Sequence, residues 1–487
     1  MNEAAANKHS GRLGALFWLG ILASAAILTA LIVRAFVLGA AAEHRTQASD
    51  RPLWSIIPFA GILLGIALLP LVPRTQHWWE HNRNKLVVAL TVASAMLLYY
   101  LWADGVSGAI AVLHRAVLDE YVPFMMLLFS LYVISGGISL RGDLPAHPAT
   151  NTAFLAAGSL IASVVGTTGA SMLLIRPLLQ TNSERRHVSH TVIFFIFLVS
   201  NVGGCLLPIG DPPLFLGYLK GVPFTWTLGL WKEWAFCTAI LLAIYYLWDL
   251  RAYRTEAPRD ISRDEAVRVP LVLRGKINFI WLAGVVLCVA FVDPHNPLPL
   301  VGRKPPLLTR EVFMLAFVGL SLITTPAGVR AANRFNYVAI LEVAALFIGI
   351  FIAMQAPIEI LNARGPELGL KHPWQFFWAT GILSSFLDNA PTYVVFFETA
   401  DALTHAPGPG VMQLLAGQFI REDLLVAISL GAVFMGANSY IGNGPNFMVK
   451  SIAEQAGVRM PSFFGYMLYS SFILLPVFVL VTLLFVR

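Results

Sequence analysis

Charged residues are scarce in this sequence. Asp, Glu, Lys and Arg together make up 12% of its 487 residues, whereas roughly 25% is usual in soluble globular domains. Hydrophobic residues make up 57%, and they fall in blocks of about 20 residues or more, the length that crosses a bilayer as a helix. The composition excludes a chain of soluble domains and predicts an all-α polytopic membrane protein. Four clear spanning segments are 53–72, 86–102, 124–140 and 463–486.

Cysteine is also rare. Cys205, Cys237 and Cys288 are isolated from one another, and no predicted helix carries two histidines four residues apart. These spacings form no metal or redox motif. No His-Glu-x-x-His motif and no Ser–His pair lies at membrane depth. We therefore expect neither an enzyme nor a protein with a resident cofactor or zinc ion.

The net charge of +6 does not indicate nucleic-acid binding, because the basic residues are spread over short loops between apolar blocks. With the N-terminus in the cytoplasm, most Lys and Arg side chains fall on the cytoplasmic side, as the positive-inside rule requires. We therefore expect the lipid bilayer of the cell (inner) membrane as a partner, and no nucleic acid. Residues 13–42 are either a retained first helix, which their length favours, or a signal peptide.

Two pairs of segments are similar within the chain. GCLLPIGDPPLF (204–215) aligns without a gap with GANSYIGNGPNF (436–447), and SVVGTTGAS (163–171) aligns with SSFLDNAPT (384–392). The pairs occur in the same order in each half. Proline interrupts a helix, and freed backbone groups survive in a membrane only where protein, water or an ion satisfies them. The pattern predicts an inverted repeat around a transport site.

These patterns predict about eleven transmembrane helices, two re-entrant hairpins and two broken helices. The hairpins are expected at 151–180 and 373–400, and the broken helices at 191–219 and 423–450. The predicted organisation is a group of N-terminal membrane helices at 1–120, a first repeat at 121–250, a cytoplasmic linker at 251–275 and a second repeat at 276–487.

Asp388 is the leading candidate for the site, because an ionised carboxylate at membrane depth is costly unless water, donors or a cation surround it. Asn389 and Thr392 supply neutral oxygens beside it, and hard cations prefer oxygen ligands. We expect Na⁺ at Asp388 and Asn389, and we expect Asp388 to exchange that ion for a proton. The alternative is structural: a buried Asp that pairs with a helix end.

Asp211 is the second candidate, since it lies among glycine and prolines in the break of the first interrupted helix. It could bind an ion or a proton, or it could cap the half-helix that follows. Asn201 and Asn443 lie at matching depth, as site amides or as structural groups. Thr167 and Thr168 lie at the tip of the first hairpin, where their hydroxyls face the site or satisfy a tight turn.

Two further ionisable residues lie in or beside apolar blocks. Arg176, in LLIRPLL, is expected to pair with an acidic group or to extend towards the membrane surface. Glu342 precedes VAALFIGIFIAM and is either an interfacial carboxylate or a functional one.

Four motifs together resemble one group of transporters. They are GTTGASMLLIRP, SNVGGCLLPIGDPP, FLDNAPTYVVF and GANSYIGNGPNFMVK. They are similar to those of the NhaD-type sodium/proton antiporters and the citrate-transport proteins grouped with them in the ion transporter superfamily. The resemblance covers roughly residues 55 to 487. It implies a homodimer in which a transport domain moves against a scaffold, with Asp388 and Asn389 at the hairpin tip and Asp211 in the first broken helix.

The main functional hypothesis is Na⁺(Li⁺)/H⁺ antiport, in which inorganic cations leave in exchange for protons. The carboxylate carriers of this superfamily have paired Ser-Asn-Thr motifs at their hairpin tips, whereas the tips here read GTTG and LDNAPT. An acidic tip repels a di- or tricarboxylate unless a cation accompanies it. The alternative is a cation-coupled citrate or di- or tricarboxylate transporter, and arsenite-type efflux is a weaker third.

Overall fold

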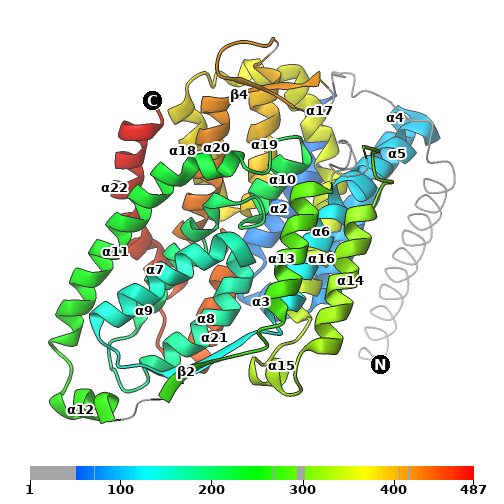
Figure 1. Cartoon of the computed structure of the whole chain (residues 1–487). Helices are drawn as coiled ribbons and strands as arrows, with labels where there is room; N and C mark the ends of the chain where they lie inside the picture. Colours follow the sequence, from blue (N-terminus) through cyan, green and yellow to red (C-terminus); the bar gives the residue numbers. More distant parts are fainter. Residues whose placement is uncertain (1–50, 71, 267–268, 293–301, 405, 415–416) are drawn as a thin grey trace, which may run out of the picture. The chain divides into compact units, whose positions relative to one another are not determined.

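The computed structural model describes residues 51–487, except 71, 267–268, 293–301, 405 and 415–416. The predicted first helix or signal peptide at 13–42 lies outside the described residues, as does the first part of the predicted helical group at 1–120. The described chain is predominantly helical (Figure 1). Its described residues form two compact units, one from Met1–Pro123 with Tyr337–Arg364 and one from Phe124–Asn336 with Gly365–Arg487.

Within the described residues, six helices are long and apolar enough to cross a membrane, or up to eight if each of two bent pairs is one span. This confirms a polytopic, mainly α-helical membrane protein, while the number of eleven spans stays a prediction. The six segments are Asn82–Ala103, Gly105–Ser135, Pro148–Val165, Ser189–Leu206, Trp226–Tyr253 and Phe463–Phe485.

Two of the predicted spanning segments end earlier than expected. The helix predicted at 124–140 ends at Ser135 in α6 (Val122–Ser135), and residues from Ser139 onward form a strand. Two consecutive glycines follow α6, and glycine favours helix ends. The segment predicted at 53–72 forms η1 (Leu53–Ile56) and α2 (Ile57–Leu68) and ends before Pro70 and Pro73, because proline cannot donate to the preceding turn.

The first unit contains η1, α2, α3 (Pro73–Trp79), α4 (Asn82–Ala103), α5 (Gly105–Leu113), the π-helix η2 (His114–Tyr121), the start of α6, α16 (Val338–Ala353) and α17 (Gln355–Arg364). The helices α4 and α16 pack closely along each other. A Cβ at Gly349 would lie 2.7 Å from the Cα of Ala89, so this approach requires glycine. Arg51 binds Glu359 through Nε at 2.7 Å and also pairs with Asp104.

The second unit contains the two predicted hairpins and the two interrupted helices. The helices α7 (Pro148–Val165) and α8 (Thr167–Thr181) meet at Gly166, whose φ is +79°. The helices α18 (Pro373–Phe386) and α19 (Asn389–Ala402) meet at residues 387–388. The first break separates α9 (Ser189–Leu198) and η3 (Val202–Leu206) from α10 (Pro212–Leu219). The second separates α20 (Glu422–Met435) and η7 (Gly436–Asn438) from α21 (Gly444–Gln455).

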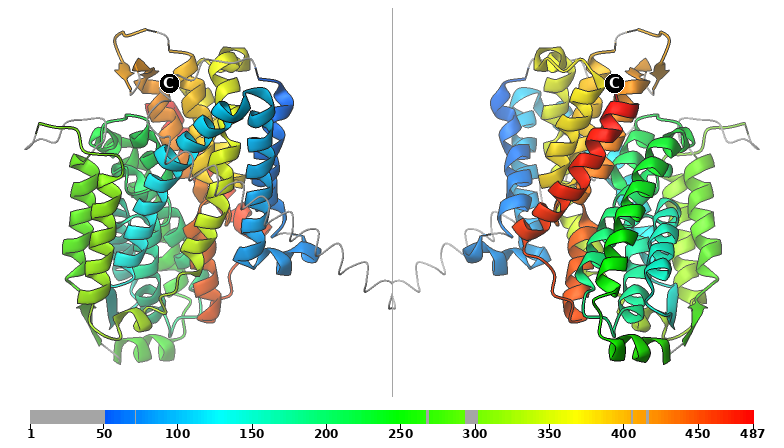
Figure 2. Two further views of the ribbon diagram at one scale, coloured as in Figure 1. Left: turned by 90° about the vertical axis from the view of Figure 1, so that its right-hand side faces the viewer. Right: turned by 90° about the vertical axis from the view of Figure 1, so that its left-hand side faces the viewer.

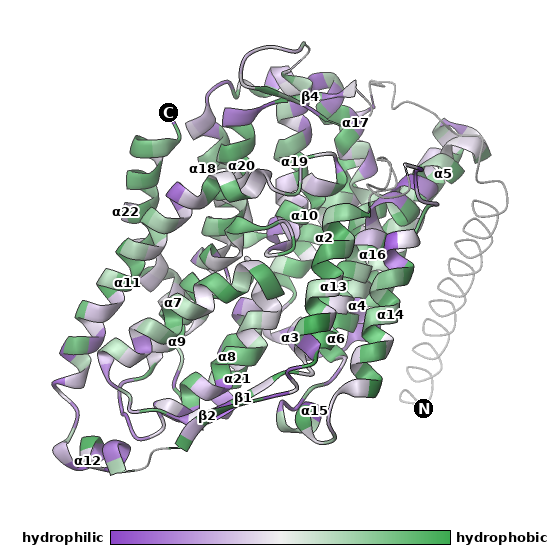
Figure 3. Cartoon of the chain, in the orientation of Figure 1, coloured by the Kyte–Doolittle hydropathy of each residue, from purple (hydrophilic) through white to green (hydrophobic). Residues whose placement is uncertain are grey.

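The remaining elements of the second unit surround these segments. They are η4 (Trp226–Leu230), α11 (Trp231–Tyr253), α12 (Pro258–Ala266), α13 (Asn278–Phe291), α14 (Thr309–Thr324), α15 (Val329–Ala332), η5 (Gly365–Leu368) and α22 (Phe463–Phe485). The helix α22 lies beside α11 (Figure 2). Hydrophobic residues run along α13, α14 and α22, whereas α12 is mainly hydrophilic (Figure 3). This difference fits membrane contact for the first three and an aqueous location for α12.

The helical fold includes two small antiparallel sheets that the sequence patterns did not predict. β1 (Ser139–Asp143) pairs with β2 (Val269–Arg274), with Ser139 opposite Arg274. β3 (Val411–Gln413) pairs with β4 (Phe419–Arg421). β2 and α12 (Pro258–Ala266) lie in the segment predicted as a cytoplasmic linker at 251–275.

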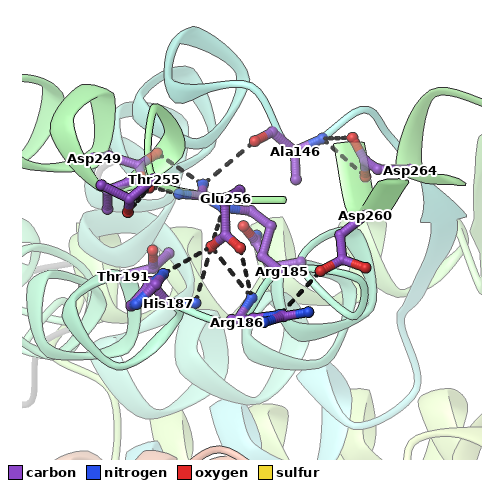
Figure 4. A network of polar contacts seen from close by, with 12 residues as sticks. Ala146, Arg185, Arg186, His187, Thr191, Asp249, Thr255, Glu256, Asp260 and Asp264 are labelled. Carbon is purple, nitrogen blue, oxygen red and sulfur yellow. Dashed lines mark hydrogen bonds and ion pairs between the residues drawn. The ribbon is translucent and has the colours of Figure 1, made fainter. Parts of the chain in front are cut away.

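A polar network anchors that segment to the loop between α8 and α9 (Figure 4). The guanidinium of Arg185 binds Asp249 at 2.6 Å, and His190 Nε2 lies 2.8 Å from the same carboxylate oxygen of Asp249. Glu256 accepts hydrogen bonds from the backbone N–H groups of residues 186 and 187, and Asp264 accepts one from the N–H of Ala146 at 2.9 Å. These contacts fix the position of α12 against the ends of the helices that carry the candidate site.

Candidate functional site

Four helix N-termini of the second unit converge on one point. Thr167 is the first residue of α8, while Asp211, Asp388 and Asn443 are the N-cap residues of α10, α19 and α21. Hydrogen bonds join these four helix starts. The Asp211 carboxylate, at the start of α10, accepts hydrogen bonds from the side chains of Thr167 in α8 and Asn443 before α21. It also accepts one from Asn389, the first residue of α19.

The local sequence explains why each helix begins here. Proline occupies the first or second position of α10 and α21, where its missing N–H costs nothing. The backbone before each start folds tightly on itself. A Cβ at Gly210 would lie 2.3 Å from the carbonyl oxygen of Gly204, and one at Gly442 would lie 2.6 Å from that of Gly436. Only glycine fits both breaks.

Asp211 is the central group of the site and is 1% exposed. Its Oδ1 accepts hydrogen bonds from Thr167 Oγ1 at 2.9 Å and from Asn443 Nδ2 at 3.2 Å. Its Oδ2 accepts one from Asn389 Nδ2 at 2.6 Å. Within the described residues, no Lys or Arg side chain is among its hydrogen-bond or ion-pair partners. All of these hydrogen-bond donors are neutral. The negative charge of Asp211 is therefore balanced by the helix N-termini or by a ligand, and not by a Lys or Arg side chain.

Side-chain amides join the two helix breaks next to Asp211. Asn201 donates from Nδ2 to Asn446 Oδ1 at 2.8 Å, and Asn443 donates from Nδ2 to Asn201 Oδ1 at 3.2 Å. Asn446 also donates to the carbonyl of Gly436 at 2.9 Å. All three asparagines are buried. The sequence analysis did not single out Asn446, although its place in GNGPNF, a segment that aligns with the break in the first half, was the available signal.

The side-chain amide of Asn389 has only one of its two polar atoms hydrogen-bonded to a described residue. Its Nδ2 binds Asp211, but its Oδ1 is buried and accepts no hydrogen bond from the residues that the structure describes. A buried acceptor without a partner is costly. A hydrogen-bond donor or a positive charge beside this oxygen would satisfy it.

Asp388 lies at the N-terminal end of α19 and makes no hydrogen bond to Asp211. It is partly exposed, and its Oδ1 accepts the backbone N–H of Ala390 at 3.1 Å, which caps α19. Thr392 donates its hydroxyl to the Asp388 carbonyl at 3.0 Å. Thr168 makes no side-chain hydrogen bond with any described residue, in contrast to Thr167. The structure therefore brings Thr167, Asp211, Asn389, Asn443 and Asn201 together, with Asp388, Thr392 and Thr168 at the margin.

Serine hydroxyls complete the polar surroundings. Ser171 and Ser200 lie 2.9 Å apart through their Oγ atoms, and Ser384 donates to the carbonyl of Ala432 at 2.8 Å. The sequence analysis did not single out these serines as site residues, because serine is common at helix contacts in membranes. Their position just beyond the amides became visible only with the fold.

The groups at this site suit two kinds of ion. Carboxylate, hydroxyl and amide oxygens suit a hard cation. The converging helix N-termini carry partial positive charge, which suits an anion such as a carboxylate. Among the described residues, no group of three or more His, Cys, Asp or Glu side chains could hold a metal ion.

Comparison with known proteins assigns this chain to a family. No curated protein matches it. A family model described as "Putative citrate transport" matches residues 48–486. This description fits the predicted alternative function better than the main hypothesis, and it covers the wider group in the predicted resemblance rather than the NhaD type. Because the match spans almost the whole sequence, the chain belongs to the putative citrate transport family, a family of transporters.

Proposed function

We propose that this protein is a secondary transporter that carries citrate, or a related di- or tricarboxylate, together with a cation. The family match supports the transported anion. The observation that carries the proposal is the meeting of four helix N-termini around the buried carboxylate of Asp211.

The helix N-termini explain how an anion is attracted to this depth. Each helix start leaves backbone N–H groups without an intrahelical acceptor, and each carries about half a positive charge. Half-helices in transporters bind substrate carboxylates in this way. The geometry supports carboxylate binding without an arginine or lysine in contact with Asp211.

Asp211 explains why a cation must accompany the anion. An ionised Asp211 repels a substrate carboxylate brought next to it. A cation bound to Asp211, with Thr167 Oγ1 and the unpartnered Asn389 Oδ1 as neighbouring oxygens, removes that repulsion. Cation and carboxylate then occupy adjacent positions, and transport of one depends on the other.

Cation/proton exchange is the second candidate function. It is favoured by the same observation on Asp211, which has only neutral hydrogen-bond partners among the described residues. A proton and Na⁺ or Li⁺ competing for one carboxylate is sufficient for antiport. In this case Asp211 is the proton-coupling group. Asp388 lies close to it, because the next residue, Asn389, binds Asp211.

Uptake by proteoliposomes tests both candidates. Radiolabelled citrate uptake is measured with Na⁺, K⁺, Mg²⁺ or no added cation outside, and a pH-sensitive dye inside reports proton movement. Citrate uptake that requires a cation supports the proposal. If Na⁺ or Li⁺ collapses an imposed pH gradient while citrate remains outside, the second candidate replaces it. If neither occurs with correctly inserted protein, both are wrong.

A further inference from the structure

The helices α16 and α17 of the first unit bend by 41° where they meet. Gln355 is the first residue of α17, and its side chain is buried. Its Nε2 donates to Glu120 Oε2 at 3.0 Å and to the carbonyl of Phe351 at 3.2 Å. Its Oε1 is also buried, but it accepts no hydrogen bond from the described residues. The bend therefore contains a buried acceptor without a described partner, which is costly unless a ligand or water lies beside it.

The orientation of the Gln355 amide follows from the groups around it. If its nitrogen and oxygen were exchanged, Oε1 would face the carboxylate of Glu120 and the carbonyl of Phe351, and neither of these acceptors could donate to it. Because Oε1 and Nε2 are bonded to the same carbon atom, the oxygen lies close to the carboxylate that Nε2 binds. A neutral oxygen and a carboxylate are thus neighbours inside the first unit.

The backbone on both sides of this contact departs from a regular α-helix. Pro357 has no N–H, so the carbonyl of Ala353, four residues before it, loses its usual helical donor. Glu120 lies in the π-helix η2, which packs against α16, and Tyr121 donates its hydroxyl to the Ala344 carbonyl at 3.0 Å. π-Helical segments are rare and often occur at functional sites, and carbonyls at helix interruptions bind cations in transporters.

The nearest charges along α17 already have partners. Glu359, four residues after Gln355, accepts a hydrogen bond from Arg51 Nε at 2.7 Å. The guanidinium of Arg51 also pairs with Asp104. Two carboxylates therefore hold this arginine, and it donates no hydrogen bond to Gln355 Oε1.

We propose that the space beside Gln355 Oε1 is a binding site for a monovalent alkali cation, with this oxygen and the Glu120 carboxylate as ligands. Hard cations prefer oxygen ligands of both kinds. A divalent ion fits less well, because no group of three or more acidic, His or Cys side chains that could hold a metal ion occurs among the described residues. The bound cation stabilises the bend between α16 and α17. The site uses residues of the first unit alone, so it does not depend on the proposed carriage of citrate.

Thermal unfolding in detergent tests this site with NaCl, KCl or choline chloride at equal ionic strength, because choline is too large to bind between the two oxygens. All measurements use Asp211→Asn as the background, which removes the carboxylate of the other candidate cation site. On this background we compare Gln355→Met, Glu120→Gln and the control Glu80→Gln, whose side chain is 59% exposed. Size-exclusion profiles confirm folding, and Glu120→Gln remains available if Gln355→Met does not fold. Equilibrium dialysis with radioactive Na⁺ counts the bound ions.

We expect NaCl or KCl to raise the melting temperature of the background protein and of the control by about 2 °C or more over choline chloride. Gln355→Met and Glu120→Gln should lose most of this gain, and most of the bound Na⁺ with it. Equal melting temperatures in the three salts overturn the proposal and assign water to the Gln355 oxygen. A gain that both variants keep also overturns it, because the cation then binds elsewhere. Neither result alters the test of citrate uptake, which is measured separately.

Discussion

Asn389 donates a hydrogen bond from its Nδ2 to Asp211 Oδ2 at 2.6 Å across a separation of 178 residues. The contact joins the start of α19 to the start of α10. A buried carboxylate needs such donors, and Asp211 obtains all of them from other helix starts. The site therefore exists only when both interrupted helices and both hairpins are in place, and small movements between them change the hydrogen bonds to Asp211.

Substitution of the two site aspartates separates their roles. Asp211→Asn removes the only central negative charge, so we expect citrate uptake to fall by roughly 100-fold or more, with the fold retained because the amide is similar in shape. Asp388→Asn keeps a good N-cap residue, and we expect uptake within about threefold of wild type. Initial rates in proteoliposomes at equal protein content measure both. If both variants lose citrate uptake to the same extent, Asp388 is as important to the site as Asp211, and this assignment of roles is wrong.

The breaks of the helices were predictable from sequence, whereas the centre of the site was not. Glycine and proline mark the breaks through local chemistry: Gly210 and Gly442 permit close backbone approach, and Pro212 and Pro445 begin the following helices. These effects involve only neighbouring residues, so the sequence displays them.

The choice between Asp388 and Asp211 depends on distant contacts. Asp388 has the more conspicuous neighbours in sequence, yet in the structure its carboxylate caps its own helix, while Asn389 turns to Asp211. The sequence analysis considered a binding role and a structural role for each residue and ranked Asp388 first. It could not see that Asp211 has three hydrogen-bond donors, because these donors come from three other segments. The pairing of β1 with β2 was not predicted for a similar reason, because more than one hundred residues separate the two strands in the sequence.

The two adjacent threonines of the first hairpin provide a matched pair. Thr167 donates to Asp211 Oδ1 at 2.9 Å, whereas Thr168 has no side-chain hydrogen bond within the described residues. Because hydrogen bonds to a charged group are worth about 1.5–3 kcal/mol, we expect Thr167→Ala to lower uptake about 10- to 100-fold. Thr167→Ser restores the hydroxyl and should recover most of it. Thr168→Ala is the control and should stay close to wild type, and a larger effect there would contradict the assignment of the site.

An ion pair between α10 and α19 is expected to stabilise the second unit. Lys220 Nζ lies 2.6 Å from Glu398 Oε1, and the Glu398 side chain is 4% exposed against 18% for Lys220. Glu398→Gln removes the negative charge from this pair and weakens the contact to Lys220. We expect a loss of about 1–3 kcal/mol in the free energy of unfolding, below the value for a fully buried pair because Lys220 reaches solvent.

Thermal unfolding in detergent measures that loss. Glu454→Gln is its control, since it breaks the pair with Lys450 whose glutamate is 43% exposed, and an exposed pair contributes at most about 1 kcal/mol. The double substitution Lys220→Glu with Glu398→Lys should recover part of the stability. If both single variants melt alike, the pair on α10 and α19 contributes no more than a surface contact.

The carboxylate of Asp264 in α12 gives a dependence of stability on pH. Burial raises the pKa of Asp264, the N–H of Ala146 opposes this by lowering it, and the charge of Glu184 raises it further. A raised pKa in the folded state means that folding favours the protonated acid. Its contribution to stability is therefore full at low pH and is lost as the pH rises through the folded-state pKa.

Asp264→Asn keeps an acceptor oxygen for Ala146 and removes this titration. We expect the variant and wild type to melt at the same temperature at pH 4, and the variant to melt higher, by about 1 °C or more, at pH 7.5. Thermal unfolding in detergent across this range measures the difference. Asp260→Asn on the same helix is the control, because Asp260 pairs with the exposed Arg186 at 3.0 Å, and its loss should lower rather than raise the melting temperature. A variant at position 264 that is less stable at pH 7.5 would show that the ionised carboxylate, as acceptor for the backbone, outweighs the cost of its burial.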